Sequence, residues 1–201
     1  YDRLVGSEMC IRDSPPTMRV AVLSSGGKDS AAAWWWAMCR GWTVEALVTV
    51  TITGEDSPMF QVPSTHVVER QAALAGVPWV NVNTSGEVPQ DIEVLEQALS
   101  QLNIDGFVSG ALRSDYQKAR LERMAERLGV VSWTPLWHQS GHDHVKGMVE
   151  QGFEIMITGV SAEGLTDAWL GRILTPETFV ELAQLAAKHR FHVEGEGGEY
   201  E

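Results

Sequence analysis

The feature that most constrains the fold is an apolar run that ends in a Ser/Gly-rich loop and leads into a helical pattern. The run covers residues 19–23 (RVAVL). A continuous apolar run of this length is typical of a buried parallel strand, which helices cover on both faces. The loop that follows consists of Ser24, Ser25, Gly26, Gly27, Lys28, Asp29 and Ser30. The sequence therefore predicts a strand–loop–helix unit at the start of the fold.

Short apolar runs and helical patterns continue to alternate along the chain. This spacing predicts right-handed crossovers between parallel strands, hence an α/β fold with a parallel sheet and helices on both faces. In such sheets ligands bind beyond the carboxyl ends of the strands. Strands are predicted at residues 19–23, 45–52, 79–82, 106–109, 130–133 and 154–160, and helices at 29–40, 65–75, 89–102, 115–128, 145–151 and 176–187.

Charge and composition limit the possible partners. The 201 residues carry 15 basic and 27 acidic side chains, a net charge of −12, and no cluster of four Lys or Arg. A field of this sign repels nucleic acid and anionic membranes, so no direct nucleic-acid partner is expected. No apolar run approaches the ~20 residues of a membrane span. Cys10 and Cys39 form no disulfide framework, which favours a cytoplasmic location, with Cys39 packed in the core.

The loop after the first predicted strand has the properties of a phosphate site. Its glycines let backbone N–H groups approach an anion, and the following helix N-terminus adds a favourable dipole. Ser25 and Ser30 can donate hydroxyl hydrogen bonds, and Lys28 adds a positive charge. Asp29 beside an anion requires a cation or a capping role. The alternative interpretation is a generic strand-to-helix turn with a serine cap.

The loop is not a Walker A motif, which would need glycine in place of Val22 and Ser or Thr in place of Asp29. Ser-Gly-Gly-Lys-Asp-Ser instead resembles the PP-loop of the ATP pyrophosphatases. That superfamily cleaves ATP between the α and β phosphates, adenylates a substrate oxygen and displaces AMP with a nitrogen or sulfur nucleophile. The resemblance implies ATP and Mg²⁺ as cofactors, catalytic roles for Lys28 and Asp29, and a nucleotide site formed by residues 24–30 with Gly110.

Two further segments narrow the choice within this superfamily. A glycine loop after the strand at 106–109 leads into a charged helix, and the sequence Pro-Leu-Trp follows the strand at 130–133. Trp137 could stack on a purine or simply pack. The helix could equally be a solvated one with ion pairs along its face. The residues of the charged segment that we assign to substrate binding are Ser114, Asp115, Tyr116, Gln117 and Arg120.

The third segment is the acidic, glycine-rich end of the chain, GEGGEYE, at residues 195–201. By composition it is a disordered acidic tail. Its glycines could equally form a tight loop that presents Glu196 and Glu199 to a metal or an amine.

Together, the segments at 24–30, 109–122, 135–137, 162–165, 170–172 and 195–201 resemble the diphthine–ammonia ligase family over residues 18–201. The resemblance implies an adenine nucleotide alpha hydrolase-like, Rossmann-like sheet with a small C-terminal subdomain. It also implies a reaction in which diphthine on translation elongation factor 2, ATP and ammonium give diphthamide, AMP and pyrophosphate. Glu196 and Glu199 would then orient ammonium or relay its proton. Trp137, Gly197, Gly198 and Tyr200 would contribute to the substrate site.

The sequence and the resemblance together predict three parts. Residues 1–17 lack a signal-peptide pattern and are expected to be a foreign or disordered extension before Met18. Residues 18–130 are expected to form the PP-loop ATP-binding domain, and residues 131–201 the C-terminal substrate-binding portion. The family's tail motif usually continues with a threonine, whereas this sequence ends at Glu201, which suggests a truncated tail.

Other functions stay open at this point. A related amide ligase could act on another carboxylate, and a non-catalytic module could bind ATP without turnover. Thiolation of tRNA is disfavoured, because Cys10 and Cys39 cannot supply a reactive pair. His138, His142 and His144 could form a zinc site, although the composition around them favours a solvated loop. The metal ligands are therefore unknown.

Overall fold

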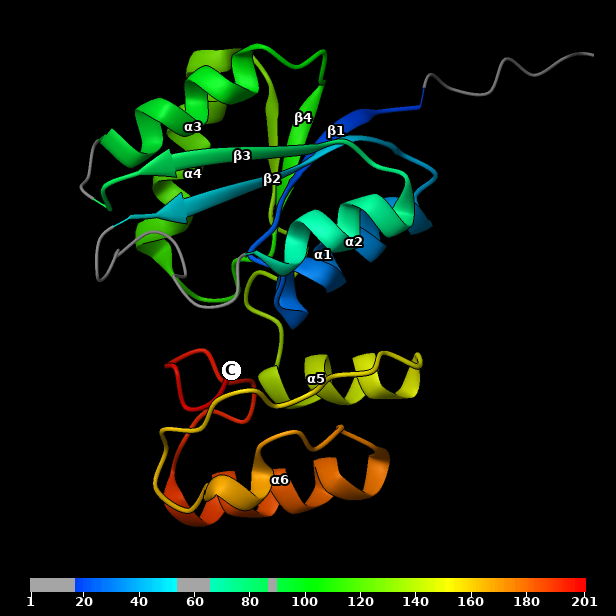
Figure 1. Cartoon of the computed structure of the whole chain (residues 1–201), viewed down its shortest axis with the longest axis vertical. Coiled ribbons are helices and arrows are strands. Elements are labelled where there is room, and N and C mark those ends of the chain that lie inside the picture. Colours follow the sequence, from blue (N-terminus) through cyan, green and yellow to red (C-terminus); the bar gives the residue numbers. More distant parts are fainter. Residues whose placement is uncertain (1–16, 54–65, 87–89) are drawn as a thin grey trace, which may run out of the picture.

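The structure, a computed structural model, describes residues 17–53, 66–86 and 90–201 (Figure 1). The predicted extension at 1–17 lies outside the described residues except for Thr17. Among those residues, the strands of the N-terminal portion form one parallel sheet in the order β3-β2-β1-β4-β5. The predicted α/β fold is thus confirmed. The strands are β1 (Arg19–Leu23), β2 (Thr43–Ile52), β3 (Trp79–Thr84), β4 (Gly106–Ser109) and β5 (Val131–Trp133).

Helices cover both faces of this sheet, as Figure 1 shows. Successive side chains of a strand point to opposite faces. Val20 and Val22 of β1 therefore pack in one core with α1 and α2, while Ala21 between them packs in the other with α3 and α4. The helices are α1 (Lys28–Cys39), α2 (Val67–Ala75), α3 (Gln90–Ser100) and α4 (Asp115–Leu128).

The strand order reverses between β1 and β4, which lie side by side in parallel. The chain leaves β1 through α1 toward β2 on one side, and leaves β4 through α4 toward β5 on the other. The loops that follow these two strands therefore diverge at a topological switch point, where α/β sheets commonly bind ligands. These loops are residues 24–27 and 110–114.

Residues 134–201 form the C-terminal portion, which lies below the sheet in Figure 1. It contains α5 (Gly141–Glu150), a short 3₁₀ helix (Asp167–Trp169) and α6 (Pro176–His189). Thr175 caps α6, whose first residue is Pro176 as predicted; proline is favoured there because its missing N–H would have no helical partner. The hydrophobic core of the C-terminal portion includes Ile157 and Leu182. It also contains Ala32 of α1 and Leu112, so the two portions share buried apolar surface.

The predicted strand at 154–160 is wrong. Ile155 and Ile157 are buried while Met156 between them is 53% exposed, so the alternation is that of an extended chain. The segment does not join the sheet. It makes only isolated bridges with two irregular stretches, Met156 with Ile173 and Val160 with Tyr200.

Two smaller predictions are also wrong. Cys39 is exposed rather than packed, because it is the last residue of α1 and Ala37 takes the buried position. The region around His142 and His144 is not a solvated loop, since α5 begins at Gly141 and His144 is buried. No described helix combines the length and the apolar character needed to cross a membrane.

Candidate active site

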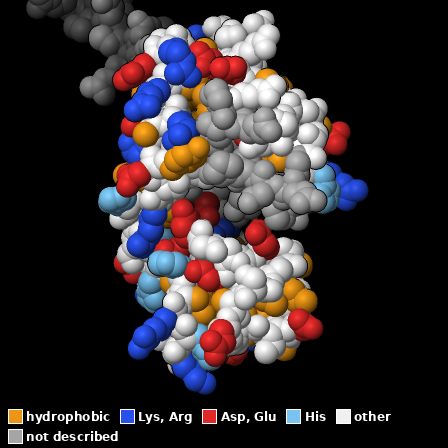
Figure 2. All heavy atoms as spheres, turned by 90° about the vertical axis from the view of Figure 1, so that its left-hand side faces the viewer, with side chains coloured by type: hydrophobic (Ala, Val, Ile, Leu, Met, Phe, Trp, Pro, Cys, Tyr) orange, Lys and Arg blue, Asp and Glu red, His pale blue; other side chains and the backbone are white. Residues whose placement is uncertain are grey.

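A cavity of about 820 Å³ opens between the two portions, and Figure 2 shows the molecule hollowed at this level with acidic side chains around the opening. Its volume falls within the range of small-molecule sites. The predicted phosphate loop forms one wall, the loop after β4 another, and the end of the chain a third. The predicted site residues among those that line it are Ser24, Ser25, Gly26, Gly27, Lys28, Asp29, Ser30, Gly110, Gln117, Glu196, Gly198 and Tyr200.

The phosphate loop is held in shape by its own hydrogen bonds. Gly26 has a φ of 86°, a conformation that favours glycine, and its N–H donates to Oγ of Ser24 at 3.2 Å. Oγ of Ser30 donates to the carbonyl of Gly27 at 2.9 Å. From α2, Nε2 of Gln71 donates to the carbonyl of Gly26 at 3.1 Å. The shape of the loop is therefore set by hydrogen bonds within the protein itself.

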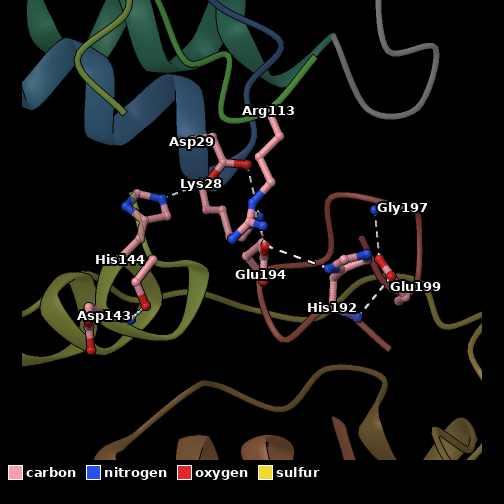
Figure 3. Close-up of polar contacts among 10 residues, drawn as sticks. Lys28, Asp29, Arg113, Asp143, His144, His192, Glu194, Gly197 and Glu199 are labelled. Carbon is pink, nitrogen blue, oxygen red and sulfur yellow. Dashed lines mark hydrogen bonds and ion pairs between the residues drawn. The ribbon is translucent and has the colours of Figure 1, made fainter. Parts of the chain in front are cut away.

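Asp29 sits in the first turn of α1 between two donors (Figure 3). Nζ of Lys28 lies 2.9 Å from Oδ2, and Nε2 of His144 lies 2.8 Å from Oδ1. Burial alone would raise the pKa of Asp29, but the hydrogen bond from His144 and the positive charge of Lys28 outweigh it and lower the pKa. Asp29 is therefore an ionised carboxylate at neutral pH.

A second contact between the portions joins Arg113, in the loop before α4, to Glu194 in the C-terminal portion (Figure 3). Nε of Arg113 lies 3.3 Å from Oε1 of Glu194. The Glu194 side chain is only 4% exposed, and among the described residues its Oε1 accepts no hydrogen bond. The attraction is thus an ion pair rather than a hydrogen bond.

The end of the chain forms a tight loop rather than a disordered tail. The Tyr200 hydroxyl donates to the carbonyl of Val193 at 2.7 Å, and burial raises the pKa of this phenol. The Tyr200 ring lies 5.7 Å from Nζ of Lys28, within cation–π range. The loop thereby brings an aromatic face to the phosphate loop.

The two predicted glutamates occupy different positions in this loop. Both carboxylate oxygens of Glu199 accept backbone N–H groups of the same loop, from His192 at 3.0 Å and Gly197 at 2.8 Å. Glu196 instead lines the cavity. Partial burial, together with the negative charges of Asp29 and Glu194, raises the pKa of Glu196. A carboxyl group with a raised pKa is better suited to proton transfer near neutral pH.

Several predicted site residues lie elsewhere. Ser114 caps α4 by accepting the N–H of Gln117 at 3.3 Å. The Arg120 guanidinium stacks 3.3 Å from the ring centroid of Tyr116. Trp137 stacks on His138, with Nζ of Lys118 5.5 Å from its centroid. The predicted residues that do not line the cavity are Ser114, Asp115, Tyr116, Arg120, Trp137, Gly197 and Glu199. The substrate roles of the first six, and the catalytic role of Glu199, stay predictions.

The three histidines considered as zinc ligands diverge. His144 faces Asp29, the His142 ring packs 5.1 Å from the Phe179 ring, and His138 stacks on Trp137. Among the residues that the structure describes, no group of three or more His, Cys, Asp or Glu side chains could hold a metal ion.

Sequence reasoning did not assign His144 or Glu194 to the site. One local signal was present for His144: Ser140 followed three residues later by Asp143 is a helix N-cap pattern, and Ser140 does accept the N–H of Asp143 at 3.3 Å. That pattern would have placed His144 in the first turns of a helix. No local signal pointed to Glu194.

Comparison with known proteins gives consistent matches. Residues 18–132 match the sequence model of the diphthamide synthase N-terminal domain, and residues 140–201 match that of the diphthamide synthase C-terminal domain. Similar proteins include the diphthine–ammonia ligases of Rattus norvegicus, 31% identical, and Homo sapiens, 30% identical, each covering 92% of this chain and 77% of the relative. That of Danio rerio is 30% identical over 92% of this chain and 80% of its own length. The chain therefore belongs to the diphthamide synthase family.

Proposed function

We propose that the protein is an ATP-dependent amide ligase that converts diphthine on translation elongation factor 2 to diphthamide, using ammonium and releasing AMP and pyrophosphate. The observation that carries the proposal is that one cavity is lined both by the phosphate loop and by the chain end with Glu196 and Tyr200. The relatives named diphthine–ammonia ligase support the choice of acceptor.

The first half of the reaction uses the phosphate loop. The β and γ phosphates would lie against Lys28 and the N-terminus of α1, whose dipole favours an anion. The diphthine carboxylate then attacks the α phosphorus, the bond to the β-phosphate oxygen breaks, and pyrophosphate leaves. The product is an acyl-adenylate. The loop stabilises the charge that develops on the departing pyrophosphate.

Mg²⁺ would be carried mainly by the triphosphate, because the described residues hold no group of three or more His, Cys, Asp or Glu side chains that could bind a metal ion. Glu196 and Asp29 line the cavity, but both oxygens of Asp29 already face Lys28 and His144. Such an ion would screen the phosphate charge during adenylation.

The second half uses the chain end. Ammonium first loses a proton to solvent to give ammonia, which attacks the acyl carbon. AMP leaves with the electrons of the acyl–oxygen bond, and a second proton must be removed from the attacking nitrogen. Glu196 is the group that we assign to this proton, since it lines the cavity and has a raised pKa. Glu199 is assigned to holding the loop.

The test is amidation of elongation factor 2 that bears diphthine, in the presence of ATP, Mg²⁺ and ammonium, read by mass spectrometry of the modified histidine. We expect conversion of the acid to the amide, dependent on ATP. Lys28→Met should abolish the conversion, and Lys146→Met, whose side chain is 52% exposed on α5, should not. AMP formation with another carboxylate but not with diphthine would favour a related amide ligase. ATP binding without AMP formation would favour a nucleotide-binding module.

A further inference from the structure

His144 and Asp29 come from opposite portions of the chain and meet at the edge of the phosphate loop. His144 lies on α5, and its side chain is only 4% exposed. Its backbone N–H donates to the carbonyl of Ser140 at 2.8 Å, so the capped first turn of α5 fixes the backbone that carries the imidazole. Figure 3 shows the ring directed at the Asp29 carboxylate.

The proton in this contact belongs to His144. The Asp29 carboxylate pairs with the Lys28 ammonium at 2.9 Å, and a carboxylate in such an ion pair can only accept hydrogen bonds. Nε2 of His144 must therefore carry the hydrogen. Each carboxylate oxygen then has one donor, with Oδ1 taken by His144 and Oδ2 by Lys28.

Lys28 cannot serve Asp29 and a phosphate fully at the same time. It lies between the Asp29 carboxylate and the Tyr200 ring, and it is the one lysine of the phosphate loop. A phosphate that draws Lys28 toward itself takes a donor from Asp29. A largely buried carboxylate that loses its partners is costly. His144 supplies a second donor that stays in place when Lys28 moves.

We propose that His144 is a positioning residue for nucleotide binding: it holds the Asp29 carboxylate and so releases Lys28 for the phosphates. The inference rests on the proposed function, in that the loop binds ATP. One consequence is that the N-terminal portion does not carry a complete phosphate site, because α5 of the C-terminal portion supplies a donor on which the loop depends.

The test compares variants of position 144 in the full chain by titration calorimetry with α,β-methylene-ATP and Mg²⁺, an analogue that cannot be cleaved between the α and β phosphates. We expect His144→Leu to weaken binding about tenfold, the size of a lost hydrogen bond to a charged group. His144→Gln keeps an N–H donor and should restore most of the affinity. His142→Leu is the matched control, since His142 is on the same helix but 52% exposed, and its affinity should not change.

In turnover, the KM for ATP should rise in His144→Leu while kcat stays close to that of the unaltered protein, a split that general unfolding would not produce. In an Asp29→Asn background, His144→Leu should have less than about a twofold effect, because the two residues act as a pair. If His144→Leu does not fold, His144→Asn, which is polar but too short to reach Oδ1, replaces it with the same expected loss.

Two outcomes separate the inference from the proposed function. If the unaltered protein does not bind the analogue, the ATP-dependent function fails and the inference fails with it. If the unaltered protein binds it and His144→Leu binds equally well, or loses as much affinity when Asp29 is already Asn, the inference alone is overturned.

Discussion

Gly110 lies against the backbone of Asp29, so closely that a β-carbon at position 110 would sit 2.7 Å from the Asp29 carbonyl carbon and oxygen and 2.8 Å from the Ser30 nitrogen. Real β-carbons do not approach backbone atoms this closely, so one of the two loops would have to move. This contact joins the loop after β4 to the phosphate loop across the switch point of the sheet. The position of the phosphate loop thus depends on Gly110, which follows Asp29 by 81 positions in the sequence.

Gly110→Ala should weaken nucleotide binding and destabilise the fold, because neither backbone can yield without disturbing the first turn of α1. We expect a loss of about 1–3 kcal/mol in the free energy of unfolding, similar to other overpacked sites. Chemical denaturation and titration with α,β-methylene-ATP would measure the two effects. Gly147→Ala in the interior of α5 is the control: apart from the backbone of its own helix, no atom lies within 4 Å of its added β-carbon, so it should stabilise the fold by about 0.5–1 kcal/mol. Equal behaviour of the two variants would contradict the account.

Arg113→Met should destabilise the contact between the two portions. It leaves the Glu194 carboxylate buried without its nearest cation, and the cost should be about 1–2 kcal/mol because Arg113 itself is 47% exposed. Thermal unfolding would measure it, and the same change made in a Glu194→Gln background should cost clearly less. Lys146→Met, which breaks an exposed pair with Glu150, should stay within about 0.5 kcal/mol. A loss that is the same with Glu194 and with Gln at that position would show that the ion pair is not the cause.

Glu196→Gln should raise the thermal stability in a pH-dependent way. The pKa of Glu196 in the folded protein is raised above its usual value of 4.5. Its ionised form is therefore disfavoured by folding, and this penalty is absent below pH 4.5 and grows as the pH rises through the folded pKa. Replacing the carboxyl group removes the penalty. The melting temperature of the variant should exceed that of the unaltered protein at pH 8 and match it at pH 4. A lower melting temperature at pH 8 would contradict the assigned environment.

Glu199→Gln should lower stability and leave ammonium use intact. The carboxylate accepts two backbone N–H groups, and an amide can accept through one oxygen only, so about 1–2 kcal/mol should be lost. The KM for ammonium should be unchanged once the protein is folded, whereas in Glu196→Gln it should rise or turnover should fall. Loss of turnover in Glu199→Gln without any change in melting temperature would return Glu199 to a catalytic role.

The N-terminal portion was predictable from local patterns. The strand at 19–23 has the predicted bounds, and α1 begins one residue before the predicted start at 29. The strand and the helix start could both be predicted because a run of apolar residues is followed directly by glycines. This pattern is local, since it spans only a few residues. The helix predicted at 115–128 also has the observed bounds. In the structure Ser114 caps its start and Gly129, in a left-handed conformation, ends it.

The C-terminal portion was less predictable because tertiary contacts decide its local structure. The composition around Gly141 favoured a loop, yet α5 begins at this residue because Ser140 caps the helix. The glycine itself is explained by a distant contact, since a β-carbon at position 141 would lie 2.1 Å from the Glu194 carboxylate. The apolar run at 154–160 indicated a strand, but the segments beside it are irregular stretches, so no sheet forms there. The contact between His144 and Asp29 could not be predicted from local sequence, because the two residues are 115 positions apart.

The most direct test of the central claim is the nucleotide product. The protein would be incubated with ATP, Mg²⁺, ammonium and diphthine-bearing elongation factor 2, and the nucleotides separated by chromatography. The account predicts AMP and pyrophosphate in amounts equal to the amide formed, with none from a Lys28→Met variant. ADP and inorganic phosphate as products would contradict it, because the loop would then not hold the departing pyrophosphate.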